Sequence, residues 1–97
     1  MKKQFAYLIM GGSYDPAAHT ATFETAGQVT HIFTVRDFEE AKERALWCAR
    51  EGFGVIEVCG AFGEGRVREL VALTGGTMGV GYVIHLPEQD TVFDTFF

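Results

Sequence analysis

Residues 55–65 of the chain, VIEVCGAFGEG, carry the side chains best suited to chemistry. Glu57 offers a carboxylate and Cys59 a thiol, and their spacing of two places both on one face of an expected strand. Glycines follow directly, and a helical pattern begins after them. A strand, a tight turn and a helix in this order present side chains and free backbone N–H groups at the ligand-binding edge of an α/β sheet. The stretch therefore predicts a pocket.

Two kinds of chemistry are open to these residues, each beside a structural role. Cys59 becomes a nucleophile if a histidine such as His19 or His85 acts as its base, or else it packs as a small apolar residue. Glu57 acts as an acid or base with a histidine partner, or else it forms a structural pair. The candidate catalytic residues are Glu57, Cys59 and His19.

Two glycine-rich turns, residues 11–13 and 60–65, each precede an expected helix. Backbone N–H groups at the start of a helix attract anions, although glycines also serve simply to make a tight turn. The residues expected to bind such a ligand are Gly11, Gly12, Ser13, Asp15, His19, Cys59, Gly60, Gly63 and Arg66.

The chain carries no local motif for a metal or a nucleotide cofactor. His19, His85, Glu57 and Asp15 have the right chemistry for a metal, but their spacing matches no short ligand motif. The second glycine turn is neither a Walker A loop nor a dinucleotide fingerprint. We therefore expect no metal and no cofactor.

Strand and helix patterns alternate along the chain. Strands are expected over residues 4–10, 28–35, 55–59 and 78–86, and helices over 17–24, 37–51 and 66–74. This alternation predicts a single α/β domain, residues 1–86, with a mainly parallel four-stranded sheet. The polar second strand favours an edge position and the flavodoxin-like order 2-1-3-4. The alternative is the order 1-2-3-4, as in half of a (β/α)8 barrel.

Composition bears on partners and location. The net charge is −5, and the basic residues form no cluster beyond Lys2 and Lys3, so nucleic acid and anionic membranes are not expected partners. No apolar run could span a bilayer and no secretion signal is seen, so Cys48 and Cys59, on an expected helix and an expected strand end, should stay reduced and a cytoplasmic protein is expected.

Aromatic residues exceed what a domain of 97 residues easily buries, with nine Phe, three Tyr and one Trp. In the order 2-1-3-4 the two longer helices cover one sheet face and leave the other short of cover. We therefore expect a homo-oligomer, a dimer or higher. Residues 87–97, an aromatic tail, and Trp47 on a charged helix face are its expected contacts.

Several stretches resemble the domain of unknown function 6506 family, a family of small uncharacterised prokaryotic proteins. They are Asp15-Pro16-x-x-His19, Glu24-Thr25, residues 38–41 (FEEA), residues 51–63 and Gly79-Val80-Gly81. The resemblance spans nearly the whole chain and implies a one-domain α/β protein without an assigned activity. The chain departs from the family pattern around Ile84 and His85, where an arginine is expected, and in its aromatic tail.

Three functions remain open at this level. The first is binding of a small anionic metabolite at the carboxyl ends of the strands. The second is an acid/base enzyme of the isomerase or lyase type that uses Glu57 and a histidine. The third is a purely structural oligomeric subunit.

Overall fold

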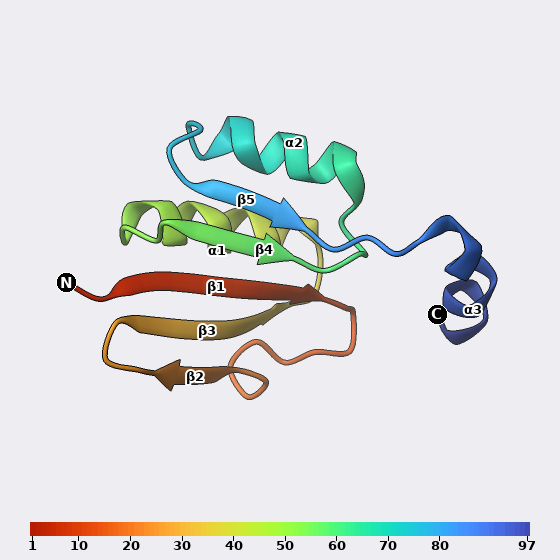
Figure 1. Ribbon diagram of the computed structural model, residues 1–97, viewed down its shortest axis with the longest axis horizontal. Coiled ribbons are helices and arrows are strands. Elements are labelled where there is room, and N and C mark those ends of the chain that lie inside the picture. Colours follow the sequence, from red (N-terminus) through yellow and green to blue (C-terminus); the bar gives the residue numbers. More distant parts are fainter.

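The protein is a five-stranded mixed sheet with two helices packed on one face, as seen in a computed structural model of residues 1–97 (Figure 1). A short helix, α3, stands apart from this body. The elements are β1 (Lys3–Met10), β2 (Ala21–Glu24), β3 (Gln28–Val35), α1 (Phe38–Arg50), β4 (Val55–Val58), α2 (Gly63–Leu73), β5 (Gly79–Tyr82), the 3-10 turn η1 (Pro87–Gln89) and α3 (Asp90–Phe96).

The strands lie in the order β2-β3-β1-β4-β5. β1 is the central strand and pairs in parallel with β3 and β4, which suits its nearly continuous apolar sequence. The four expected strands keep the relative order 2-1-3-4, but the sheet has a fifth, antiparallel strand, so the expectation of four strands is wrong. The alternative order 1-2-3-4 is also wrong, because β1 lies between β3 and β4.

The expected helix over residues 17–24 does not form. Its second half is β2, which pairs antiparallel with β3, so the second expected strand is not at the edge. Thr25 closes the connecting hairpin: its N–H donates to the carbonyl of Gln28, and its hydroxyl oxygen accepts from the Gln28 N–H. The unpaired backbone of β3 outweighs the weak helix preference of so short a segment.

The helix α1 begins and ends where its sequence predicts. The Asp37 carboxylate accepts the N–H of Glu40 at 2.9 Å and caps the first turn. Gly52, with φ of +82°, takes up the left-handed conformation that follows the last turn. The Glu40 side chain does not return to the capping residue itself. It accepts the N–H of Arg36, one residue earlier, at 2.7 Å.

The second half of the domain differs from expectation mainly in its boundaries. α2 begins at Gly63, three residues before the expected start, and Gly63 itself has a positive φ of 71°. β5 is shorter than expected and ends at Tyr82, although the N–H of Val83 still donates to the carbonyl of Val58. Residues beyond this point leave the sheet.

The core lies on one side of the sheet. Alternate residues of β1 and β4, including Leu8 and Ile56, are fully buried against Ala45 and Cys48 of α1 and Leu70 of α2. No helix packs on the opposite side, which Figure 1 views with α1 behind the sheet. We call this side the open face; its apolar residues are Phe5, Tyr7, Ile9, Phe23, Ile32 and Val55.

Candidate functional site

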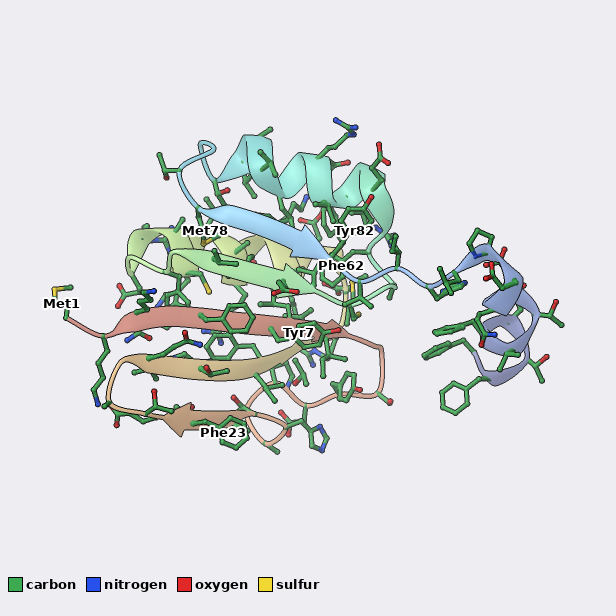
Figure 2. The ribbon with its side chains drawn as sticks, in the orientation of Figure 1. Met1, Tyr7, Phe23, Phe62, Met78 and Tyr82 are labelled. Atoms are coloured by element: carbon green, nitrogen blue, oxygen red, sulfur yellow. The ribbon has the colours of Figure 1, made fainter.

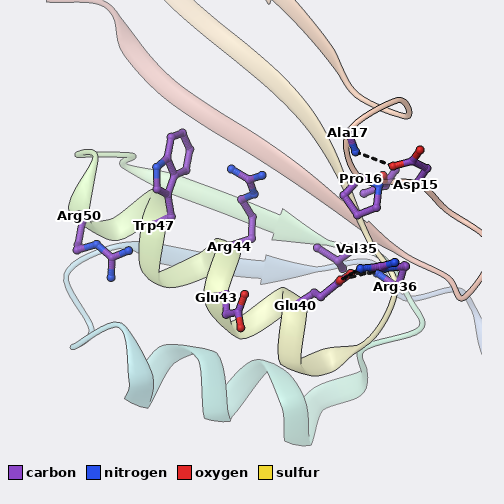
Figure 3. A pocket seen from close by; sticks show the side chains of 11 residues that line it. Asp15, Pro16, Ala17, Val35, Arg36, Glu40, Glu43, Arg44, Trp47 and Arg50 are labelled. Carbon is purple, nitrogen blue, oxygen red and sulfur yellow. Dashed lines mark hydrogen bonds and ion pairs between the residues drawn. The ribbon is translucent and has the colours of Figure 1, made fainter.

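A groove runs between α1 and the carboxyl end of β3 and has a volume of about 530 Å³. One wall is a stripe of α1 at helical spacing, and the other is the loop from Asp15 to Ala17 that follows β1 (Figure 3). The lining residues are Asp15, Pro16, Ala17, Thr34, Val35, Arg36, Glu40, Glu43, Arg44, Trp47 and Arg50. We call this the α1 groove.

Arg44 occupies the middle of the α1 groove. Its guanidinium carbon lies 4.4 Å from the centre of the Phe33 ring and 4.9 Å from that of Trp47. Both contacts are cation–π interactions that hold the side chain in one place. No carboxylate lies within ion-pairing distance of Arg44, and no hydrogen bond uses its N–H donors. The groove therefore contains a positioned cation whose donors are free.

Arg36, at the mouth of the groove, is already paired. Arg36 donates from Nε to the Glu40 carboxylate at 2.9 Å. The hydrogen bond to Glu40 raises the pKa of Arg36, and the same bond lowers the pKa of Glu40 below its usual value. This pair lies at the amino-terminal end of α1, whereas Arg44 and Arg50 line the groove without an ion-pair partner.

Asp15 and His19 lie together in the loop between β1 and β2. The N–H of Asp15 donates to Nδ1 of His19 at 2.9 Å, and the Asp15 carboxylate accepts the N–H of Ala17 at 3.0 Å. The hydroxyl of Thr34 on β3 donates to the carbonyl of His19 at 2.7 Å and ties the loop to the sheet. Asp15 lines the α1 groove.

Glu57 and Cys59 lie away from this groove. Glu57 is beside Tyr7 on the open face, whereas Cys59 follows the last residue of β4 and packs against the core. Glu57 is opposite Tyr7 in the strand register and is exposed, with neither an ion pair nor a hydrogen bond to a histidine. The Cys59 sulfur accepts the N–H of Met10 at 3.4 Å. Glu57 lines a separate groove with Lys3, Phe5 and Val55. The expected Glu57–histidine pair is therefore not brought together within one chain.

The two glycine turns lie at the carboxyl ends of β1 and β4. Gly11 packs tightly, because a Cβ there would lie 2.9 Å from the Tyr14 ring, while Gly12 and Ser13 are exposed. Gly60 and Gly63 flank the start of α2. Arg66 in its first turn donates to the carbonyl of Ala61 at 3.2 Å and lies over Phe38. None of these residues lines the α1 groove.

The comparison with protein families matches residues 3–97 to the model described as "Family of unknown function (DUF6506)". The chain belongs to this family. No curated protein and no solved structure matches it. The resemblance seen in the motifs is thus confirmed over essentially the whole chain.

In this DUF6506 protein, the sequence contains the α1 residues of the groove on one helix face but suggests a different role for that face. Glu40, Glu43, Arg44 and Trp47 share one helix face, which a sequence reading takes for an exposed surface with an interface tryptophan. In the structure Trp47 is half-buried and packs edge-on to Phe33 at 5.9 Å and against Phe53 at 5.6 Å. The sequence does not show that this helix face packs against β3, where Phe33 lies under Arg44.

Two further absences hold for the whole chain. No helix is long and apolar enough to cross a membrane. No group of three or more histidine, cysteine, aspartate or glutamate side chains is arranged to hold a metal ion.

Proposed function

We propose that this protein binds a small organic anion with a flat ring in the α1 groove, at the carboxyl end of β3. The observation that carries the proposal is Arg44, a guanidinium without an anionic partner that is held over Phe33 and Trp47. A guanidinium in this position can donate two parallel hydrogen bonds to a carboxylate or a phosphate. Trp47 supplies an aromatic surface beside it.

Other groups of the groove add selectivity. Asp15 uses its carboxylate for one N–H of its own loop, and the acceptor capacity that remains suits a hydroxyl or ammonium group of the ligand. Arg50 adds positive charge to the lining. The carboxylate of Glu43 repels a second negative charge on the ligand. The arrangement favours a ligand with one acidic group and one donor group over a polyanion.

The glycine turn at residues 60–65, together with Arg66, stays a second predicted location for an anion. The α1 groove is the stronger candidate because its cation is free, whereas Arg66 already donates to Ala61. The acid/base hypothesis for Glu57 also stays a prediction, and it is the weaker one because no histidine forms a hydrogen bond with Glu57.

Trp47 makes the test direct, because it is the only tryptophan of the chain. Its fluorescence is followed during titration with phenyl phosphate, benzoate, inorganic phosphate and the neutral analogue benzamide. We expect a saturable change with the first two and a much weaker one with the others. In Arg44→Gln the apparent dissociation constant should rise about tenfold or more, equivalent to about 1.4 kcal/mol.

Arg68→Gln is the matched control. Arg68 is an exposed arginine of α2 that pairs with Glu64 and lies outside the α1 groove. This variant should titrate like the wild-type protein. An absence of saturation with both aromatic anions, or equal affinity in Arg44→Gln and wild type, contradicts the proposal.

A further inference from the structure

The open face is an apolar surface that nothing covers within one chain. Its centre is formed by Phe5, Tyr7 and Ile9 of β1 and by Ile32 of β3, and Phe23 of β2 is 58% exposed beside them (Figure 2). Sheets whose central strands are parallel normally have both faces covered. Here α1 and α2 cover only the other face. We therefore expect another element to pack on the open face.

Residues 84–97 also expose apolar side chains that nothing in the chain covers. We call them the arm. In α3 the residues Val92, Phe93 and Phe96 fall on one side, and the aspartates and threonines fall on the other; Phe97 follows directly after the helix. Phe96 is 82% exposed and Phe97 92%. The arm makes the molecule longer than a compact domain: its radius of gyration is 13.9 Å, against about 12.5 Å for a compact domain of this length.

Contacts within the arm fix its own conformation. The ring of His85 stacks on Phe93, with centroids 3.9 Å apart and planes at 10°, and Nε2 of His85 is 2.6 Å from the Asp90 carboxylate. Leu86 precedes Pro87 and is extended, with φ of −65° and ψ of 142°, as a residue before proline prefers. These contacts lie within the arm, so they hold α3 and the segment before it together as one preformed unit.

We infer that α3 of one copy packs on the open face of a second copy, and that the exchange is reciprocal in a twofold dimer. Phe96 and Phe97 each bury about 150–250 Å² when covered. Two arms and the two faces that receive them then bury about 1,200–2,000 Å², the range of stable specific interfaces. The aspartates of α3 stay on its outer side, in water. The exchange uses the sheet face opposite the α1 groove and does not depend on the proposed ligand.

The mass of the full-length protein in solution gives the first test. Light scattering on a gel-filtration column should give a dimer for the wild-type chain at about 100 µM, because association depends on protomer concentration. The double variant Phe96→Asp/Phe97→Asp should run as a monomer with an unchanged circular-dichroism spectrum. A monomeric wild-type protein, or a dimer that persists in the double variant, overturns the inference.

Disulfide trapping between two differently marked chains identifies the surfaces. Mixed Phe96→Cys and Ile32→Cys proteins should form a covalent heterodimer on mild oxidation, with the wild-type chain as the control for Cys48 and Cys59. Phe96→Cys mixed with Val71→Cys, on the outer side of α2, should not. Cross-linking of Ile32→Cys mainly with itself would mean that two open faces meet directly, which overturns the arm exchange. A monomeric disulfide in the Phe96→Cys/Ile32→Cys double variant would place the arm on its own sheet and overturn it as well.

Discussion

Tyr7 on β1 and Glu57 on β4 are directly opposite each other on the open face. Partial burial raises the pKa of Tyr7 above its usual 10.0, and the negative charges of Cys59 and Glu57 raise it further. Neither Tyr7 nor Glu57 has an ion-pair partner. The partly buried surroundings of Tyr7 and the nearby negative charges thus make ionisation of its hydroxyl unfavourable.

Replacing Glu57 by glutamine should lower the pKa of Tyr7 without returning it to 10.0, because burial is the larger cause. The wild-type protein keeps its full stability below pH 10 and loses some as the pH rises through the raised folded pKa, since the unfolded chain ionises first. NMR titration of the Tyr7 ring resonances measures the shift. Glu64→Gln, on α2, is the control, and an identical Tyr7 titration in wild type and Glu57→Gln contradicts the prediction.

The two cysteines should differ in reactivity. Cys48 is fully buried in α1, and burial raises its pKa to about 11, so it carries almost no thiolate at neutral pH. Cys59 is half-buried at the end of β4. Ellman's reagent should therefore modify only Cys59 in the folded protein and both thiols in urea. Rapid modification of Cys48 in a folded Cys59→Ala variant would contradict this.

Asp37→Ala should destabilise the protein by about 1 kcal/mol, because the N–H of Glu40 loses its capping acceptor. Urea denaturation followed by circular dichroism measures the change. Asp37→Asn keeps a capping oxygen and should recover most of the loss. Equal stability of the alanine and asparagine variants would show that the cap contributes nothing.

The elements predicted best are those with strong local signals at both ends. α1 has Asp37 before it and Gly52 after it, and these alone locate its ends. The strand β2 was missed because Pro16 suggests a helix start, whereas the deciding factor is the long-range pairing of β2 with β3. The hairpin at residues 25–28 depends on the Thr25 hydroxyl, a weaker signal than an Asn-Gly turn.

The site is less predictable than the fold for a related reason. The sequence predicts Glu57 and Cys59 on one strand face, but β4 ends at Val58 and Cys59 packs against the core. The α1 groove in turn needs residues from three separate segments. Arg44 gains its role only because β3 places Phe33 beneath it. Residue spacing along α1 shows that Arg44 and Trp47 share a face, but it cannot show which strand that face meets.

A core substitution should be far more costly than a similar surface one. Leu8 on β1 is fully buried, and Leu8→Ala should lower the free energy of unfolding by about 3 kcal/mol through lost burial and a cavity. Leu73, at the end of α2, is 41% exposed, and Leu73→Ala should change it by no more than about 0.5 kcal/mol. Both values come from urea denaturation. Similar losses in the two variants would contradict the one-sided core.

His85 should contribute to the arm exchange although it lies outside α3 itself. In His85→Ala the stacking on Phe93 and the bond to Asp90 are both lost, so the arm is no longer held in one position before it docks. Each interaction contributes about 0.5–1.5 kcal/mol. Ordering a loose arm on binding then weakens the dimer about tenfold.

Sedimentation equilibrium measures this dissociation constant in wild type, His85→Ala and the control His19→Ala. His19 lies in the loop between β1 and β2, and its ring contacts no part of the arm. His19→Ala should match the wild type, because nothing in the exchange touches that loop. A dissociation constant that is unchanged in His85→Ala would mean that the arm docks equally well without its brace, and that the geometry at His85 follows from docking and does not prepare it.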